Sequence, residues 1–238
     1  MRLLCVIPAR FGSTRLPGKP LRLLRGEPLI RVVTRRALAL DLAATVVVAS
    51  DEQRVLDAVD GLGVETVLTD AGHASGTERV AEVTSRLRVG EADIVLNLQG
   101  DEPFLPPDAA AGAVARVRAG DDVGTAAQPL MGTAWRDPNR VKVELDGRGR
   151  AQRFYRTPAM PTCGLPAPTF HHLGVYAYRP SALRRWVALP PVADERAEGL
   201  EQLRPLAHGL RIGVAVLPEV APHGIDTEND LRLAEAML

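Results

Sequence analysis

The chain has 238 residues and no formal net charge, because 29 lysine and arginine residues balance 29 aspartate and glutamate residues. Hydrophobic residues make up 46% and charged residues 24%, which is ordinary for a globular protein and excludes a disordered or fibrous one. A dedicated nucleic-acid binder would carry a basic excess, so we expect no nucleic-acid partner. Only two of the cations, Lys19 and Lys142, are lysine, and codon bias toward arginine accounts for most of this preference.

The cysteines and the apolar segments favour a cytoplasmic protein. Cys5 and Cys163 form at most one pair, which is no disulfide framework and fits a reducing compartment. The first apolar run, Leu3–Pro8, is too short for a membrane span or a signal peptide. No later segment has the roughly 18 apolar residues of a membrane span, so we expect no membrane insertion.

The first half of the chain alternates between strand and helix patterns. Short apolar runs rich in β-branched residues fit buried parallel strands, and the alternation predicts an open α/β sheet with helices on both faces. In chain order we expect a strand at Leu3–Pro8, a loop at Ala9–Pro20, a helix at Pro28–Ala39, a strand at Thr45–Ala49, a helix at Glu52–Asp60, a strand at Val64–Leu68, a helix at Thr77–Arg88 and a strand at Ile94–Leu98.

The second half is less regular. We therefore expect one mixed α/β domain over residues 1–238, with a β-rich lobe at residues 130–180 within it. Its predicted elements are a hairpin formed by Val141–Glu144 and Ala151–Tyr155 around the turn Asp146-Gly147, a strand at His171–Tyr178, a helix at Asp194–Leu206, a strand at Leu210–Leu217, and a closing helix at Thr227–Met237 capped by Asp226 or Thr227.

The loop after the first strand favours a polyphosphate ligand. Arg10, Arg15 and Lys19 lie among small residues there, and phosphate oxygens need positive charge together with many hydrogen-bond donors. The loop lies at the carboxyl end of a strand, where open α/β sheets bind ligands. A solvated basic loop is the alternative, and the absence of a GxGxxG motif argues against a nicotinamide oxidoreductase.

Carboxylates at two places are candidate metal ligands. Asp101 follows the fourth strand, where a carboxylate facing a cationic loop suits a hard divalent metal held partly by phosphate oxygens. Asp226 is a second candidate, although the local sequence favours an ordinary N-cap there. Ser75 or Thr77 similarly fits a helix cap, or a hydroxyl that contacts a nucleotide at a helix N-terminus.

Several motifs together resemble the 3-deoxy-manno-octulosonate (Kdo) cytidylyltransferases, also called CMP-Kdo synthetases. The resemblance begins in the loop Arg10–Leu21 and spans the whole chain. It continues in His73–Arg79, Asn97–Pro103, Pro138–Val143, His172–Arg179, Leu200–Arg204 and Gly224–Thr227.

This resemblance implies a nucleotide-diphospho-sugar transferase-like α/β fold of three layers, with a mixed, mostly parallel sheet. It implies a nucleotidyltransferase that makes CMP-Kdo and pyrophosphate from CTP and Kdo, and so activates Kdo for lipopolysaccharide synthesis. Magnesium is the implied cofactor, and a cytoplasmic homodimer is the implied assembly.

The resemblance also assigns roles to residues. Lys19, Asp101 and Asp226 are implied to be catalytic, and both aspartates are implied to bind magnesium. The implied CTP-binding residues are Ala9, Arg10, Ser13, Arg15, Lys19, Ser75, Thr77 and Arg79. The implied sugar-binding residues are Gln99, Arg156, His172, Tyr176, Glu201 and Gln202. An arginine such as Arg156 suits a sugar carboxylate, because a guanidinium pairs with it bidentately.

The chain departs from the family pattern near the implied sugar pocket. Tyr155 replaces a small residue beside Arg156, the segment Thr162–Phe170 is shorter than usual, and His171 stands where an arginine is common. A related acid sugar, such as 8-amino-3,8-dideoxy-octulosonate, is therefore an alternative substrate. A non-catalytic nucleotide-binding protein is an alternative of another class.

Overall fold

The structure is a computed structural model that describes residues 2–43, 45–156, 168–222 and 224–237. It divides into two compact units, one made of Met1–Leu105 with Pro222–Leu238 and the other of Pro106–Ala221. Among the described residues, no helix combines the length and the apolar character that crossing a membrane requires. The expectation of a single domain with a β-rich lobe at residues 130–180 stays a prediction.

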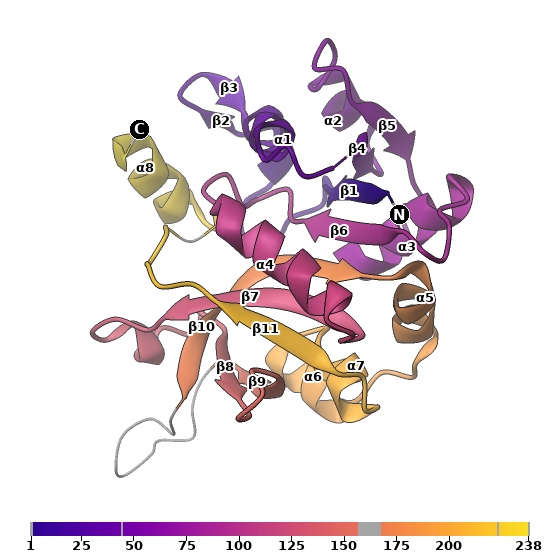
Figure 1. Cartoon of the computed structure of the whole chain (residues 1–238). Helices are drawn as coiled ribbons and strands as arrows, with labels where there is room; N and C mark the ends of the chain where they lie inside the picture. Colours follow the sequence, from indigo (N-terminus) through magenta and orange to yellow (C-terminus); the bar gives the residue numbers. More distant parts are fainter. Residues whose placement is uncertain (1, 44, 157–167, 223, 238) are drawn as a thin grey trace. The chain divides into compact units, whose positions relative to one another are not determined.

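The first unit contains a parallel sheet that confirms the four predicted strands. Its members are β1 (Leu3–Pro8), β4 (Thr45–Ser50), β5 (Glu65–Leu68) and β6 (Ile94–Leu98), in the order β6-β1-β4-β5 (Figure 1). Every residue of β1 and β6 is buried, as expected for short apolar strands covered on both faces. The carboxyl ends of β1 and β6 therefore lie side by side.

Helices and a short hairpin complete the first unit. The predicted helix at Glu52–Asp60 is shorter than expected, because the chain continues in tighter turns, with the N–H of Val59 bonded to the carbonyl of Leu56 at 3.1 Å. The elements are η1 (Lys19–Leu21), β2 (Leu23–Leu24), β3 (Glu27–Pro28), α1 (Leu29–Ala39), α2 (Gln53–Asp57), α3 (Gly76–Arg86) and α8 (Glu228–Met237).

The second unit contains a mixed sheet in the order β11-β7-β10-β8-β9. Strands β7 and β11 are parallel, whereas β10 pairs antiparallel with β7 and β8, and β8 pairs antiparallel with β9. The strands are β7 (Val123–Pro129), β8 (Lys142–Leu145), β9 (Ala151–Tyr155), β10 (Thr169–Tyr178) and β11 (Ile212–Val216). Together with the parallel sheet of the first unit, this confirms the predicted mixed α/β class.

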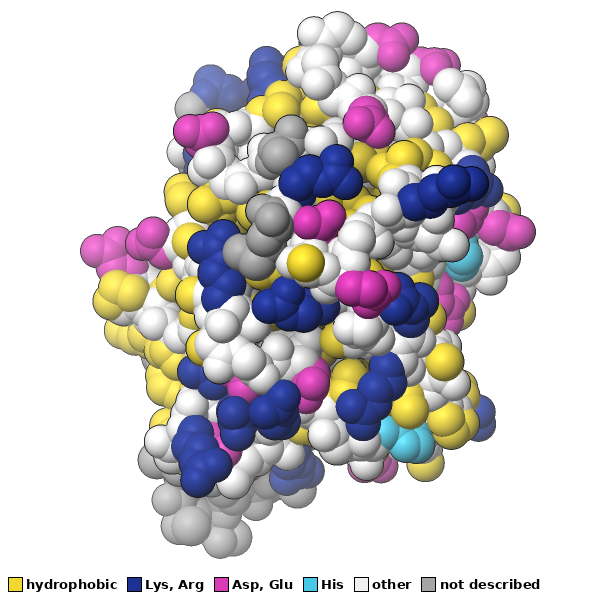
Figure 2. All heavy atoms as spheres, turned by 45° about the vertical axis from the view of Figure 1, so that its right-hand side comes forward, with side chains coloured by type: hydrophobic (Ala, Val, Ile, Leu, Met, Phe, Trp, Pro, Cys, Tyr) yellow, Lys and Arg dark blue, Asp and Glu magenta, His cyan; other side chains and the backbone are white. Residues whose placement is uncertain are grey.

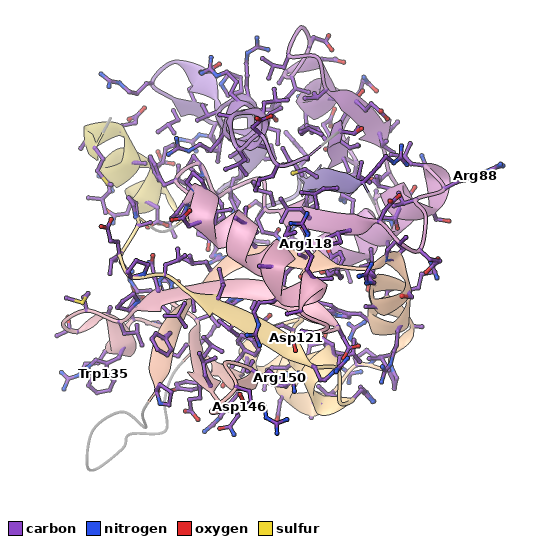
Figure 3. All side chains as sticks on the ribbon, viewed as in Figure 1. Arg88, Arg118, Asp121, Trp135, Asp146 and Arg150 are labelled. Carbon is purple, nitrogen blue, oxygen red and sulfur yellow. The ribbon has the colours of Figure 1, made fainter. Side chains whose placement is uncertain are left out.

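The predicted hairpin is present. Its turn is closed by Asp146 (labelled in Figure 3), whose Oδ1 accepts the backbone N–H groups of Arg148 and Arg150 at 2.8 Å each. Arg150 also donates through Nε to Asp121 at 2.7 Å, and Arg116 pairs with the other oxygen of Asp121 at 2.8 Å. Asp121 is buried, so two arginines compensate the cost of removing its charge from water.

The remaining elements of the second unit are helical. Helix α4 (Pro107–Arg118) lies across β7 and β11 (Figure 1) and, like β7, has no counterpart among the predicted elements. The prediction of one helix at Asp194–Leu206 is wrong. Gly199 has φ 62°, in the left-handed region, and ends α6 (Ala193–Glu198) before α7 (Leu203–Ala207) begins. The others are η2 (Ala134–Arg136) and α5 (Pro180–Ala188).

Charged side chains of both signs are mixed on the surface. Figure 2 shows lysine and arginine side chains lying among aspartate and glutamate on the face that it displays. This agrees with the zero net charge.

Candidate active site

A cavity opens in the first unit at the carboxyl ends of β1 and β6. It is bordered by the loop after β1, the N-terminus of α3, the turn after β6 and the segment before α8. Its lining residues are Pro8, Ala9, Arg10, Ser13, Thr14, Arg15, Lys19, Pro20, His73, Ser75, Gly76, Arg79, Gln99, Gly100, Asp101 and Asp226. The loop Ala9–Pro20, which is predicted to bind phosphate and is called the phosphate loop below, is thus brought together with both predicted metal ligands.

Lys19 lies between the two candidate metal ligands. Its Nζ donates to Asp101 Oδ2 at 2.5 Å and to Asp226 Oδ1 at 2.8 Å. Arg15 reaches the same oxygen of Asp226 at 3.0 Å. Burial alone lowers the pKa of Lys19, but the charges of Asp101 and Asp226 outweigh it, so the pKa lies above its ordinary value.

The segment before α8 approaches the turn after β6 closely. The N–H of Ile225 donates to the carbonyl of Asp101 at 2.8 Å. A Cβ on Gly224 would stand 2.9 Å from that carbonyl oxygen and 2.8 Å from the carboxyl carbon of Glu102, so only glycine fits there. This contact brings Asp226 to Asp101 from a distance of more than 100 residues in the sequence.

Glu102 is a titratable residue that directly follows Asp101 and was not predicted from the sequence to matter for the site. Burial, followed by the neighbouring charges of Asp101 and Asp226, raises the pKa of Glu102 to about 8. A third carboxyl that keeps its proton near neutral pH limits the negative charge collected around Lys19. Its position directly after Asp101 was the available signal, but adjacency alone does not indicate burial.

The phosphate loop carries its cations on a tightly bonded backbone. Ser13 Oγ accepts the N–H of Leu16 at 3.3 Å, and the N–H of Ala9 donates to the carbonyl of Ala49 at 2.8 Å. The backbone N–H of Ala9 is therefore already bonded within the fold, which leaves its carbonyl and methyl groups for a ligand. Arg10 is exposed, so its guanidinium is accessible to an anion entering the cavity.

The N-terminus of α3 combines capping with cavity lining. Ser75 is the N-cap, and its Oγ accepts the N–H of Glu78 at 3.2 Å. Thr77 is buried and is not among the cavity-lining residues. Arg79 lines the cavity but is bonded to Thr69, to the carbonyl of Asp70 and to Asp51. The assignments of Ser75, Thr77 and Arg79 to CTP stay predictions.

His73 also lines the cavity and was not among the predicted site residues. Its Nε2 is hydrogen-bonded to Glu82, which the backbone N–H of Asp70 also reaches at 3.0 Å. Gln99, the one predicted sugar-binding residue in this unit, donates through Nε2 to Asn97 Oδ1 at 3.3 Å.

The other predicted sugar-binding residues belong to the second unit, where His172 and Tyr176 form an aromatic cluster. The His172 ring lies 5.1 Å from the Phe154 ring, and the Tyr176 ring packs edge-on against Trp186 at 5.7 Å. Burial, followed by Glu201, raises the pKa of Tyr176 well above its ordinary value. Glu201 and the buried Gln202 directly precede α7, and the charge of Glu201 reaches Tyr176.

Thr125 determines which ring nitrogen of His172 carries the hydrogen. The Thr125 hydroxyl lies 2.7 Å from the carbonyl oxygen of Val175 and 2.9 Å from His172 Nε2. A carbonyl only accepts, so the hydroxyl donates to it and accepts the hydrogen bond of the Nε2–H group. Burial, with a smaller contribution from His171, lowers the pKa of His172 to about 3. His172 is therefore neutral, with Nδ1 as a hydrogen-bond acceptor.

Arg156 is fixed by backbone acceptors. Its Nε donates to the carbonyl of Glu198 at 2.9 Å and its guanidinium to that of Pro138 at 3.3 Å. Lys142, the second lysine, is buried and donates to the carbonyls of Asp137 at 2.6 Å and Arg156 at 2.5 Å. Cys163 and most of the shortened segment Thr162–Phe170 lie outside the described residues.

Comparison with known proteins places these features in a family. A family model described as cytidylyltransferase matches residues 4–212. A 3-deoxy-manno-octulosonate cytidylyltransferase of Gemmatimonas aurantiaca is 47% identical over 239 residues, covering 97% of this chain and 92% of the relative. The enzyme of that name from Methylococcus capsulatus is 48% identical and covers 98% and 95%.

A solved structure agrees with the sequence relatives. CMP:2-keto-3-deoxy-manno-octonic acid synthetase complexed with CTP superimposes with a TM-score of 0.89 at 36% identity, covering 100% of this chain and 98% of that chain. The expected nucleotide-sugar transferase-like fold is thereby confirmed. The chain belongs to the cytidylyltransferase family and, within it, to the 3-deoxy-manno-octulosonate cytidylyltransferases.

Proposed function

We propose that the protein transfers CMP from CTP to Kdo and releases pyrophosphate. The anomeric hydroxyl oxygen of Kdo forms a bond with the α-phosphorus of CTP, and the bond from that phosphorus to the bridging oxygen of the β-phosphate breaks. The hydroxyl proton leaves to solvent or to a base that we do not assign. Neutralising and aligning two anionic substrates is the main task, because such transfers need little covalent chemistry from the protein.

The observation that carries the proposal is the position of Lys19 between Asp101 and Asp226 on a cavity bordered by the phosphate loop. Lys19 supplies positive charge in the shielded part of the cavity, and the exposed Arg15 and Arg10 supply it at the surface. Triphosphate oxygens entering the cavity would meet all three cations. The family relatives match nearly the whole chain, and their names and the complex with CTP support the same pair of substrates.

The two aspartates fit a magnesium ion. Their carboxylate oxygens are the hard ligands that magnesium prefers, and the ion pairs of both with Lys19 support a site that attracts positive charge. Two carboxylates leave positions of an octahedral magnesium shell open, and substrate phosphates would complete the coordination. When bound, magnesium neutralises negative charge on the triphosphate.

The second unit would supply the sugar contacts. His172 is neutral and offers Nδ1 as an acceptor for a sugar hydroxyl, and Glu201 and Gln202 directly precede α7. Arg156 remains our candidate for the sugar carboxylate, although its guanidinium already donates to two backbone carbonyls. A homodimer, a cytoplasmic location and a role in lipopolysaccharide synthesis are inferred from the family resemblance.

The test is pyrophosphate release from CTP with Kdo in the presence of magnesium. We expect release only when the sugar is present, and no release from folded protein would refute the proposal. Faster turnover of 8-amino-3,8-dideoxy-octulosonate than of Kdo would keep the chemistry and correct the substrate.

A further inference from the structure

Asp51 joins the phosphate loop to helix α3. It follows β4 directly, and its two carboxylate oxygens have different partners. Oδ1 accepts the backbone N–H of Phe11 at 3.0 Å, and Oδ2 accepts Arg79 NH2 at 3.3 Å. The Asp51 side chain is 16% exposed and the Arg79 side chain 2%, so the pair is shielded from water. One carboxylate therefore connects segments that are 40 and 28 residues away from it.

Arg79 is held so that its charge faces Asp51. Its NH1 donates to the hydroxyl of Thr69 and to the carbonyl of Asp70, the latter at 3.3 Å. With these acceptors and Asp51 engaged, the guanidinium is not available to swing toward a ligand without breaking buried hydrogen bonds. The structure thus gives Arg79 a role in fixing Asp51, although it also lines the cavity.

Phe11 is the point at which Asp51 reaches the loop. The Phe11 carbonyl accepts the N–H of Ser13 at 3.0 Å. The Phe11 ring lies 4.8 Å from the guanidinium of Arg54, and a Cβ on Gly18 would stand 3.5 Å from the same ring. Gly18 immediately precedes Lys19, so the ring and backbone of Phe11 support both ends of the loop that carries the cations.

We propose that Asp51, held by Arg79, is a positioning residue that fixes the phosphate loop in the conformation that binds the triphosphate. The inference rests on the proposed function for the identity of the ligand. A loop that is ordered before binding does not lose conformational freedom when the ligand arrives, so removing the anchor weakens affinity for the ligand. The loss falls on CTP, because both partners of Asp51, Phe11 and Arg79, belong to the loop and the helix that border the cavity.

The test compares Asp51→Ala and Asp51→Asn with a matched control. Asp51→Ala removes both contacts, and we expect the KM for CTP to rise about tenfold with kcat and the KM for Kdo changed less than about threefold. Asp51→Asn keeps an acceptor oxygen for the Phe11 N–H, so we expect it to recover most of this loss. The Kd of pyrophosphate, measured by calorimetry, should rise in parallel and requires no turnover.

Asp93→Ala is the control. Asp93 likewise accepts a backbone N–H, that of Arg2 at 2.7 Å, and pairs with the Arg2 side chain, but at the amino ends of β1 and β6. Its side chain is 13% exposed, close to the value for Asp51. We expect Asp93→Ala to leave the KM for CTP and the Kd of pyrophosphate unchanged.

The outcomes separate this inference from the proposed function. If the wild type binds pyrophosphate but does not turn over CTP with Kdo, the proposed function is wrong, while weaker pyrophosphate binding in Asp51→Ala still supports the anchor. Unchanged pyrophosphate affinity in folded Asp51→Ala would overturn it. If Asp51→Ala does not fold, Asp51→Asn decides, and a KM for CTP more than tenfold above wild type would then overturn the role of the acceptor oxygen.

Discussion

Lys19 contacts two carboxylates that come from distant parts of the sequence. Its ammonium is 2.5 Å from Asp101 and 2.8 Å from Asp226, and its side chain is 15% exposed. A compact ammonium fits between two oxygens at these distances, whereas a planar guanidinium is larger and directs its donors differently. The chain uses arginine almost everywhere else, so the geometry gives a physical reason for lysine at this position.

We therefore expect Lys19→Arg to lower kcat/KM for CTP by at least about tenfold even though it preserves the charge. Steady-state kinetics with saturating Kdo measure this. The exposed Arg36 on α1 provides the control, since Arg36→Lys should leave kcat/KM within about twofold. Near-normal kinetics of Lys19→Arg would contradict the geometric argument.

The lowered pKa of His172 predicts that the stability of the fold depends on pH. Its pKa is about 3 in the folded protein and about 6.5 in an unfolded chain. As the pH falls below 6.5, this histidine binds a proton in the unfolded chain but stays neutral in the folded protein. The free energy of unfolding therefore decreases between about pH 6.5 and pH 3. The expected loss from this residue is about 2 kcal/mol between pH 7.5 and pH 5.

Urea denaturation of the wild type and of His172→Gln at the two pH values measures this contribution. Glutamine keeps a donor for Thr125 but does not titrate, so the pH-dependent loss should be smaller in the variant by about 2 kcal/mol. An equal loss in both proteins would show that His172 does not titrate as described.

Individual site residues were foreseeable from the sequence only where a motif marked them. Arg10, Arg15, Lys19 and Asp101 were predicted because strand ends in an α/β sheet are where ligands bind. Glu102 and Thr125 were not, because their importance comes from partners far away in the sequence, Asp226 for Glu102 and His172 for Thr125. Their residue types alone, an acid and a threonine, fit an exposed surface equally well.

At the scale of elements, the parallel strands were predictable and parts of the second unit were not. Continuous apolar runs such as Leu3–Pro8 and Ile94–Leu98 specify buried strands almost on their own. Helix α4 buries mainly alanine and valine, among them Ala109, Ala113 and Val117. Small side chains give weak contrast between the two faces of a helix, so its period is hard to recognise.

The break between α6 and α7 depends on Gly199. Its φ of 62° is strained for any residue with a Cβ, whereas the space around that Cβ is empty. We therefore expect Gly199→Ala to lower the free energy of unfolding by about 1 kcal/mol through backbone strain alone.

Thermal or urea denaturation measures this loss, and Gly147→Ala is the matched control. A Cβ at Gly147 also meets no atom within 4 Å, and its φ lies outside the left-handed region. The control should change stability by less than about 0.5 kcal/mol. Equal effects of the two substitutions would mean that α6 and α7 are not separated by a left-handed residue.

At the scale of the whole molecule, the zero net charge conceals a concentrated electrostatic site. Cations of the phosphate loop face carboxylates that reach the same cavity from the turn after β6 and from the segment before α8. The family motifs indicated which residues matter, but not that Asp226 returns to the first unit after the chain has formed the second. Long-range connections of this kind follow from packing and have no local signal in the sequence.

The most direct test of the account is the rate of magnesium-dependent pyrophosphate release from CTP and Kdo by the wild type and by Asp101→Asn. Asparagine keeps the size of the side chain and removes the charge that a magnesium ion requires. The account predicts that the wild type releases pyrophosphate only when CTP, Kdo and magnesium are all present, and that folded Asp101→Asn is slower by about 100-fold. Release without Kdo, or equal rates for the two proteins, would contradict it.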